Sequence, residues 1–440
     1  MDKSMFETGN LSSIRQALND MHVVDIADVL GEMDEQLVVK VFRMLPKDMA
    51  AEVFAYLSHD VQQEIIEGIA DREIGGIIDE LFLDDAVDFI EEMPANVVRR
   101  VLAAVPKEKR DIINHFLKYP DDSAGSVMTI EYVSLKKDIT IHEAFTQIRE
   151  KAIDKETIYT CYVIDSDRRL IGTVSARTLL LATPTDLIGD IMERNLISAA
   201  TTDDKESLVN DFVKYSLLAM PIVDSENRLV GIVTVDDALD VQEEEATEDF
   251  EIMAAMSPSD EPYLKTTVWS LTKNRIPWLL ILMLSATVTG AILAGFEDAL
   301  AALPALVIYI PMLMDTGGNS GAQSSTLIIR GMAIEEIALS DVWRVLWKEI
   351  RVAVLCGAVL VLVNFVRIML VSRDWVMAVT VSLALYLTVI MAKTVGCLLP
   401  LAAKKMRLDP AVMASPVITT IVDAGALGVY FTLAKVLMKL

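Results

Sequence analysis

Asp423 is the residue whose type and surroundings most directly suggest chemistry. It lies inside PVITTIVDAGALGVYF, between apolar runs. A carboxylate at membrane depth is costly, so such a residue usually faces a wet cavity or a cation. Thr419 and Thr420 precede Asp423 by four and three residues and Ser415 precedes it by eight, so a helix places all four on roughly one stripe. The stripe predicts the wall of an ion path, and a hydrogen bond between packed helices is the alternative.

A second polar segment, PMLMDTGGNSGAQSSTLIIR, interrupts an apolar stretch. Glycines there predict an unwound or kinked helix, which is tolerated at membrane depth only when it is buried in protein or lines a watery path. We expect the following residues to line that path: Gly317, Gly318, Asn319 and Gln323. A loop between two short helices is the alternative. Asp315 either joins the lining or lies at its mouth, and Lys393 either snorkels to the interface or pairs with an acid such as Asp315.

Five apolar segments position these residues. A membrane-spanning helix needs about 20 mainly apolar residues. The candidates are Ile276 to Phe296, Ala299 to about Arg330, Val352 to Val371, Trp375 to Leu401, and Asp409 to Leu440. The second is too long for one straight helix. The Lys and Arg residues of the flanks gather at 273–275, 330–351 and 404–407, all on one side, which predicts a cytosolic side and a C-terminus outside.

The acidity of the chain lies entirely in front of the membrane part. Before Ile276 there are 54 acidic and 27 basic residues, and from Ile276 onward there are 10 and 12. A block this negative is a poor partner for nucleic acid or anionic lipid and a good partner for cations. The N-terminus MDKSMFETGN lacks the apolar core of a signal peptide, so we expect the soluble part in the cytoplasm. The three cysteines show no CxxC spacing, which argues against a disulfide framework or a zinc site.

Two internal repeats organise the soluble part. In the first, Asp25, Asp28, Pro46 and Lys47 are among the residues that recur 60 positions later, and apolar residues at three- and four-residue spacing predict stacked short helices, a small α-solenoid. In the second, two similar segments combine short β-branched runs with a helix, which predicts a pair of α+β modules.

The expected organisation is a multi-domain membrane protein. The predicted ranges are a helical-repeat domain at 1–125, α+β modules at 126–190 and 191–245, an acidic connecting helix at 246–275 and a five-helix transmembrane domain at 276–440.

The connecting segment carries the most distinctive charge pattern. Between Leu229 and Leu264 there are eleven acids and no Lys or Arg. On a helix several of them would share one side and repel one another, so a positive partner must compensate them. Hard oxygen ligands select Mg²⁺, Ca²⁺ or Mn²⁺, and the membrane part contains no His, which argues against carriers of zinc, copper or iron. Mg²⁺ keeps much of its water and is usually held by one or two carboxylates, which fits a lone Asp423, doubled if two subunits share a pore.

TGGNSGAQSSTLIIR, the LDP at Leu408 to Pro410, SPVITTIVDAGALGVYF and the order of the domains together resemble the MgtE family of magnesium channels. The paired modules resemble cystathionine-β-synthase (CBS) domains. The resemblance implies Mg²⁺ uptake through a multi-pass homodimer in the plasma (inner) membrane, with Asp423 as the ion-binding carboxylate. It also implies that cytosolic Mg²⁺, bound by acids of the soluble domains and the connecting helix, closes the pore.

The same resemblance implies which acids bind the regulatory Mg²⁺. They are Glu52, Asp84, Asp88, Asp204, Glu206, Asp237, Asp240, Glu245, Glu248, Asp249 and Asp409. Ser216 stands where the family pattern leads us to expect an acid. Because CBS modules often bind adenosine nucleotides, Thr234 and Asp236 of GIVTVDD form a candidate ATP site. The first module has Ser175 and Arg177 instead, so we expect at most one such site.

One alternative remains open, a divalent cation carrier coupled to Na⁺ or H⁺, with Lys393 and Asp315 as the coupling charges. An enzymatic function has little support, because the sequence offers no Ser/His/Asp set, phosphate-binding loop or paired His ligands.

Overall fold

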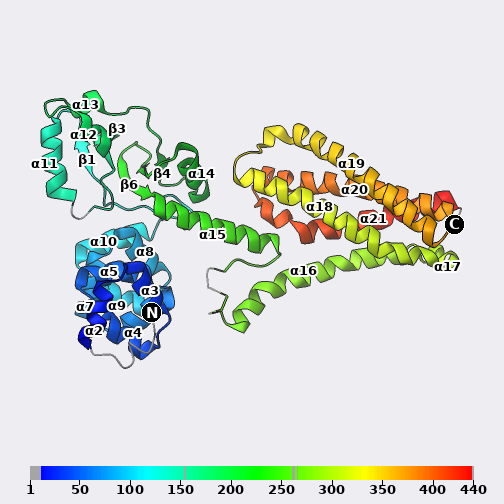
Figure 1. Ribbon diagram of the computed structural model, residues 1–440, viewed down its shortest axis with the longest axis horizontal. Coiled ribbons are helices and arrows are strands. Elements are labelled where there is room, and N and C mark those ends of the chain that lie inside the picture. The colour runs from blue at the N-terminus through cyan, green and yellow to red at the C-terminus, as the bar shows by residue number, and fades with distance from the viewer. Residues whose placement is uncertain (1–10, 153–154, 260–262, 265, 439–440) are drawn as a thin grey trace. The chain divides into compact units, whose positions relative to one another are not determined.

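The computed structural model describes residues 11–152, 155–259, 263–264 and 266–438. The chain divides into two compact units, Met1–Val241 and Gln242–Leu440. Figure 1 labels most of their helices and strands. Each unit has hydrophobic clusters of its own.

Short helices build the first part of the amino-terminal unit. They are α2 Leu11–Asn19, α3 Val23–Gly31, α4 Glu35–Phe42, α5 Lys47–Ala55, α6 His59–Gly68, α7 Asp71–Glu80, α8 Leu83–Glu91, α9 Ala95–Ala104 and α10 Lys107–Phe116. The starts of α3, α4 and α5 recur 60 residues later as α8, α9 and α10, which confirms the predicted helical repeat. Pro46, Pro94 and Pro106 stand directly before helices, where a missing N–H costs no helical hydrogen bond. Phe54 and Phe89 join the two repeats in the core, with ring centroids 5.0 Å apart.

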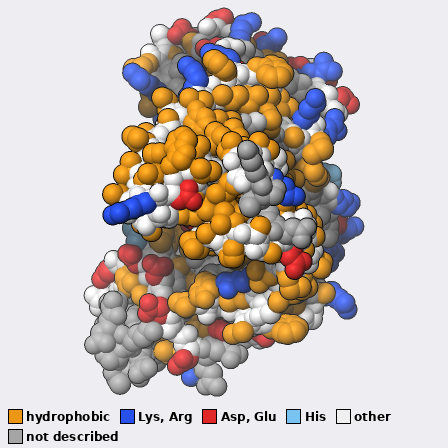
Figure 2. Space-filling view, turned by 90° about the vertical axis from the view of Figure 1, so that its right-hand side faces the viewer, with side chains coloured by type: hydrophobic (Ala, Val, Ile, Leu, Met, Phe, Trp, Pro, Cys, Tyr) orange, Lys and Arg blue, Asp and Glu red, His pale blue; other side chains and the backbone are white. Residues whose placement is uncertain are grey.

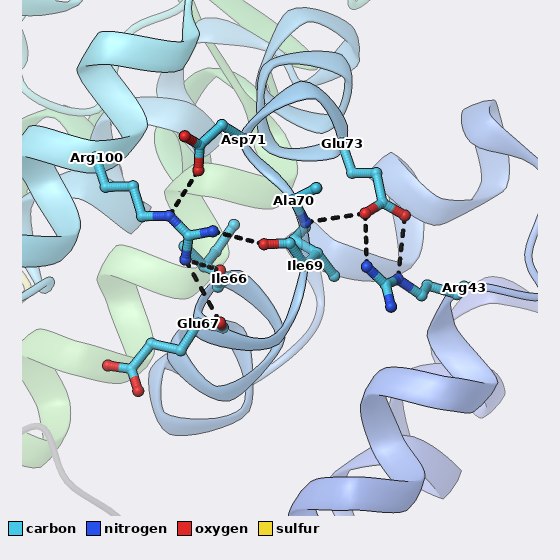
Figure 3. Close-up of polar contacts among 8 residues, drawn as sticks. All are labelled: Arg43, Ile66, Glu67, Ile69, Ala70, Asp71, Glu73 and Arg100. Carbon is cyan, nitrogen blue, oxygen red and sulfur yellow. Dashed lines mark hydrogen bonds and ion pairs between the residues drawn. The ribbon is translucent and has the colours of Figure 1, made fainter.

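Two arginines connect helices of this part (Figure 3). Arg100 on α9 donates hydrogen bonds to the carbonyl oxygens of Ile66 and Ile69, at 2.8 and 2.6 Å. These carbonyls lie at the end of α6, where helical partners run out and a cation is favoured by the helix dipole. Arg43 forms an exposed ion pair with Glu73 at 2.7 Å. Arg100 therefore stabilises the packing of α9 on α6, whereas the Arg43 pair is open to solvent.

Two α+β modules follow, each built on a three-stranded sheet. The first contains β1 Ser134–Lys136, α11 Ile141–Lys151, β2 Thr160–Ile164, β3 Leu170–Ser175, α12 Ala176–Leu181 and α13 Ile188–Ile191. The second contains β4 Ala199–Ala200, α14 Lys205–Tyr215, β5 Ala219–Val223, β6 Leu229–Thr234 and α15 Val235–Met253. In each sheet a parallel pair, β1 with β2 or β4 with β5, is extended by an antiparallel partner, β3 or β6. The shared topology confirms the predicted pair of α+β modules.

Reciprocal hydrogen bonds join the two modules at matching positions. The Leu170 N–H donates to the Asn227 carbonyl, and the Leu229 N–H donates to the Arg168 carbonyl, both at 3.0 Å. Arg168 and Asn227 occupy corresponding turns and have φ angles of 64° and 61°. The duplicated sequence thus contacts itself through equivalent residues.

Long helices dominate the carboxy-terminal unit. Its elements are α16 Val268–Ala294, α17 Glu297–Ala302, η2 Pro304–Tyr309, α18 Ile310–Ala333, η3 Leu339–Asp341, α19 Val342–Val371, α20 Trp375–Lys405, η4 Pro410–Met413 and α21 Ser415–Met438. In the described part of the chain, four segments are long and apolar enough to span a membrane: Val268–Ala294, Leu339–Val371, Trp375–Lys405 and Pro410–Met438. They match four of the five predicted spans. The fifth, 299–330, is divided into α17, η2 and α18, and the polar residues of α18 set it apart from the apolar helices.

The surface of this unit is unusually apolar. None of the described side chains of α16 is buried, although the helix is rich in Leu and Ile. Leu355, Leu362 and Leu370 of α19 are each at least 66% exposed. Figure 2 shows hydrophobic side chains over much of the face in view. Such a surface requires lipid or another apolar partner around it.

The glycine-rich segment of α18 is not broken. The prediction that Gly317 to Gln323 unwind the helix is wrong, because α18 is one α-helix from Ile310 to Ala333. The glycines instead allow close approach: a Cβ on Gly396 of α20 would lie 2.2 Å from the Gly321 carbonyl oxygen, which no real Cβ tolerates. The absence of side chains therefore serves backbone contact between α18 and α20.

The acidic connecting segment is divided as well. The helix α15 starts directly after β6 and ends at Met253, so the predicted boundary at 245 falls inside a continuous helix. Non-helical residues separate it from α16, which begins at Val268, before the predicted start of the first span at Ile276. Asp260 and Glu261, two of the eleven acids, lie outside the described residues.

Candidate functional site

Asp423 lies on α21 in an apolar helix, as predicted. Its carboxylate atom Oδ1 is buried and accepts no hydrogen bond from any described residue. Thr420 donates its hydroxyl to the Pro416 carbonyl at 3.1 Å, and Thr419 packs against Gly318. The side chain of Ser415 lies outside the described part. A buried carboxylate atom without a donor needs a cation or water, because the membrane offers neither.

A polar stripe follows the exposed face of α18. It consists of Asp315, Asn319 and Gln323, spaced four residues apart, and all three are exposed. Gly317 and Gly318 are buried on another face, where they contact α20 and α21. The predicted lining role thus fits Asn319 and Gln323 better than the two glycines, which position the helix.

Lys393 neither snorkels nor pairs with Asp315. It is 5% exposed on α20, and its ammonium group donates to the Ser324 hydroxyl at 3.3 Å. Ser324 in turn donates to the carboxylate of Glu349 on α19 at 2.6 Å, and Glu349 is 9% exposed. The charge of Lys393 is therefore balanced by Glu349, and the Ser324 hydroxyl bridges the two side chains by hydrogen bonds. Sequence reasoning missed Glu349 because it precedes the apolar core of its helix and reads as a flank residue.

Acids also gather where α15 ends. Asp249 and Glu248 on α15 and Asp409, before α21, lie close enough for their charges to interact. Burial, together with the charges of Asp409 and Glu248, raises the pKa of Asp249 to about 6, and Arg330 opposes the rise. We call Glu248, Asp249 and Asp409 the foot cluster. In the same unit, Ile252 and Met253 pack against Ile329 of α18 and against Ala411 and Ala414. The end of α15 thus packs on α18, which carries the polar stripe, and on η4, Pro410–Met413, which directly precedes the helix of Asp423.

A larger acidic cluster lies in the amino-terminal unit and consists of Asp84, Asp85, Glu156, Asp236 and Asp237. Burial raises the pKa of Asp84 well above its usual range, with Asp237 the next cause. Burial and the charge of Asp237 raise the pKa of Asp85 to about 7. The same two causes raise the pKa of Glu156 to about 8. The pKa of Asp237 rises to about 6 through burial, although a hydrogen bond from Thr234 opposes the rise. When they are ionised, these carboxylates therefore repel one another in a partly dehydrated site.

Two members of this acidic cluster were not predicted. Asp85 appears in the sequence only as a repeat position, matching Asp25. Glu156 stands alone between α11 and β2, and no local pattern marks it. Its carboxylate atom Oε2 is buried without a hydrogen-bond partner among the described residues. Only the packing of the helical repeat against the modules brings Asp85 and Glu156 together.

The remaining predicted sensor acids have varied surroundings. Glu52 is exposed on α5, and Asp204 caps α14 by accepting the Glu206 N–H at 2.9 Å. Asp88 is exposed beside His59, at 3.9 Å. Asp240 adds its charge to that of Asp237. On α15, Glu245 is half-buried.

The acidic cluster suits a hydrated divalent cation better than a preformed cage. Within the described residues, no three His, Cys, Asp or Glu side chains are arranged to enclose a metal ion. A cation that keeps its water shell needs only one or two direct carboxylates. The elevated pKa values and the buried Glu156 oxygen are the features that such a cation would relieve.

The candidate nucleotide residues differ in availability. Thr234 is 5% exposed, and its hydroxyl is committed to the Asp237 carboxylate. Asp236, in the first turn of α15, is exposed. Thr234 thus orients a member of the acidic cluster.

Comparison with known proteins agrees with this architecture. The family described as divalent cation transporter matches residues 310–433, the MgtE intracellular N domain matches 21–122, and CBS domains match 124–184 and 188–244. The chain is 36% identical over 439 residues to a magnesium transporter MgtE of Thermus thermophilus, covering 98% of this chain and 97% of that protein. It is 30% identical over 434 residues to that of Bacillus subtilis, covering 98% and 95%.

A solved structure also matches the amino-terminal part. The crystal structure of the cytosolic domain of the Mg²⁺ channel MgtE in complex with ATP is 34% identical, covers 54% of this chain and 98% of that chain, and superposes with a TM-score of 0.52. Helical repeat, paired CBS modules and apolar helices together define a membrane protein of the divalent cation transporter class. The chain belongs to the MgtE family, which confirms the resemblance and the non-enzymatic class predicted from the sequence.

Proposed function

We propose that the protein carries Mg²⁺ across the plasma membrane into the cell along a path lined by α18 and α21. The observation that supports this most is the Asp423 carboxylate, which lies in an apolar helix and has a buried oxygen without a hydrogen-bond partner among the described residues. The amide side chains of Asn319 and Gln323 on α18 supply further oxygens. A hydrated Mg²⁺ needs few direct ligands, so a single carboxylate with surrounding water and amide groups suffices for a site that must also release its ion.

Two copies of the chain complete the path. In one chain the polar stripe faces outward from a helix whose neighbours are apolar, and such a face is unfavourable against lipid. A second copy related by twofold symmetry would enclose both stripes in one wet passage. We therefore propose a homodimer, with the amino-terminal unit in the cytoplasm as the basic flanks at Lys273, Arg344 and Lys404 favour.

The acidic clusters are the proposed sensors of cytosolic Mg²⁺. Carboxylates in the acidic cluster repel one another, and a bound divalent cation supplies the missing positive charge. The helix α15 carries Asp236 and Asp237 in its first turn and Glu248 and Asp249 near its end, about 18 Å further along the helix axis. A cation bound near the first turn of α15 would thus restrain this helix. The other end of α15 packs on Ile329 of α18 and on Ala411 and Ala414, which precede α21. The restrained arrangement is the closed one.

The contacts of Lys393 bear on the alternative of a coupled carrier. Lys393 is engaged with Ser324 and Glu349, so a coupled carrier would have to use other charges, and we favour a channel.

The related cytosolic domain in complex with ATP supports an adenosine nucleotide site on the CBS modules, where Asp236 is the exposed candidate. ATP binding measured on Asp236→Ala checks that site.

The function is tested by Mg²⁺ uptake into liposomes containing the full-length protein, followed with an enclosed Mg²⁺-sensitive dye. Wild type should admit Mg²⁺, and Asp423→Asn should not, although it keeps the size and shape of the side chain. The control is Glu336→Gln, an exposed acid outside α18 and α21. Uptake by Asp423→Asn at the wild-type rate would reject Asp423 as the ion site.

A further inference from the structure

Asp315 is an acid at membrane depth that the proposed path does not yet use. It lies on α18, in the same exposed polar stripe as Asn319 and Gln323. Its carboxylate forms no hydrogen bond or ion pair with any of the described residues, so its charge is not compensated locally. A charge this costly is rarely left uncompensated within a membrane.

Contacts between α18 and α21 fix the level of Asp315. A Cβ on Gly321 would lie 2.6 Å from Ile418, one on Gly318 would lie 3.0 Å from Thr419, and one on Gly317 would lie 2.9 Å from Val422. In this series of contacts the residue number decreases in α18 while it increases in α21, so the two helices run antiparallel. The same progression brings Asp315 level with Asp423. Consistent with this register, the two carboxylates lie within electrostatic range of each other.

The nearby lysine does not neutralise this pair. Lys393 donates to Ser324 and to the Ser320 carbonyl, and Ser324 connects it to Glu349. Glu349 and Lys393 therefore balance each other on the buried side of α18. Asp315 and Asp423 are left with two negative charges and no fixed cation between them among the described residues.

We infer that Asp315 is a second ion-binding carboxylate, which acts together with Asp423 on the same hydrated divalent cation. The inference rests on the proposed function and adds to it a second fixed charge for each chain. Two carboxylates match the charge of one divalent cation, and Mg²⁺ commonly uses one or two of them while it keeps several waters. Asp315 stands on the exposed stripe and Asp423 is partly buried, so Asp315 meets the hydrated ion first and Asp423 holds it.

The test measures Mg²⁺ uptake by the reconstituted full-length protein over a range of external Mg²⁺. Asp315→Asn removes the charge and keeps the shape, and we expect KM for Mg²⁺ to rise about tenfold, as one lost charge several ångströms from a divalent ion in a wet site implies. Asp315→Glu should stay within about threefold of wild type, because the charge is retained. Glu336→Gln is the control for a general loss of surface charge. The rise with Asp315→Asn should persist at high ionic strength, because an ion in contact is screened far less than one in bulk solution.

Several results would overturn the inference. One is a KM for Asp315→Asn within twofold of wild type while Asp423→Asn abolishes uptake, which would leave the proposed function intact. Another is a rise that disappears at high ionic strength. If Asp315→Asn also lowers the maximal rate, restoration by Asp315→Glu supports the inference and lack of restoration overturns it. Absence of any Mg²⁺ uptake by wild type would instead reject the proposed function itself.

Discussion

The acidic cluster predicts that the amino-terminal unit becomes more stable as the pH falls from 8 to 6 in the absence of Mg²⁺. Asp85, Glu156 and Asp237 have folded-state pKa values of about 7, 8 and 6. In the unfolded chain, Asp and Glu titrate near about 4. Between these limits the folded state binds protons that the unfolded state does not, so protonation favours folding. This change of stability with pH has the opposite sign to the change caused by an ordinary carboxylate in a salt bridge, whose folded-state pKa is lowered.

The magnitude follows from the number of protons taken up. Each net proton contributes about 1.4 kcal/mol for each unit of pH. The carboxylates interact and do not titrate independently, so we count one net proton and expect about 3 kcal/mol between pH 8 and pH 6. Mg²⁺ should replace the proton: a concentration 100 times its dissociation constant stabilises by about 2.7 kcal/mol at pH 7.5. Near pH 5.5 this gain should shrink, because protonated carboxylates bind cations poorly.

Hydrogen exchange measured by mass spectrometry on the full-length protein in detergent provides the assay. Amides of α8 and β6 report on opening of the acidic cluster. Asp85→Asn removes one of the repelling charges, so it should slow exchange without Mg²⁺ at pH 7.5 and reduce the further protection that Mg²⁺ gives. Asp138→Asn, an exposed acid in the same unit outside the cluster, is the matched control. Once exchange rates are corrected for the intrinsic effect of pH, weaker protection as the pH falls from 8 to 6, or faster exchange in Asp85→Asn without Mg²⁺, would refute the reasoning.

Three further predictions concern packing and are checked by unfolding of the purified variants. Gly396→Ala should lower the free energy of unfolding by about 3 kcal/mol or more, because the added Cβ would lie 2.2 Å from a carbonyl oxygen. Gly428→Ala, with open space around it, should be neutral or slightly stabilising. Equal effects of the two changes would contradict the close approach at Gly396. Lys393→Met should lower the free energy of unfolding by about 3 to 5 kcal/mol, because it leaves Glu349 buried without a cation. Adding Glu349→Gln should restore part of the lost stability. No restoration would argue against the pairing of Lys393 with Glu349. Arg100→Ala should cost about 2 kcal/mol through its lost bonds to the α6 carbonyls, and an unchanged midpoint would show that water replaces them.

The features that sequence reasoning predicted correctly depend on local patterns. Apolar runs, the 60-residue helical repeat and the duplicated modules can all be recognised from the order and spacing of residues along the chain. The position of Asp423 within an apolar helix follows from the same kind of pattern, whereas its role as the ion site stays a prediction. The predicted 60-residue offset equals the offset between the starts of α3, α4 and α5 and those of α8, α9 and α10.

The features that were missed depend on tertiary contacts. Glu156 joins Asp85 and Asp237 although they are far apart in sequence, and no spacing rule connects them. Likewise, Lys393 meets Glu349 only because Ser324 lies between them. The glycines of α18 were interpreted as helix breakers because glycine has low helix propensity, yet close contact with α20 compensates that cost. Whether a glycine breaks a helix or admits a neighbour is decided by the neighbour.

We propose that carboxylates of the soluble part sense Mg²⁺ and restrain the ion path that contains Asp423. The most direct measurement is Mg²⁺ flux through the reconstituted full-length protein with Mg²⁺ clamped on the side of the amino-terminal unit. We predict that wild-type flux falls as this clamped Mg²⁺ rises, and that Asp237→Asn shifts the fall to higher concentrations while keeping flux at low Mg²⁺. Flux that is independent of the clamped Mg²⁺, with Asp423→Asn still inactive, would contradict the sensing role and leave only an ungated path.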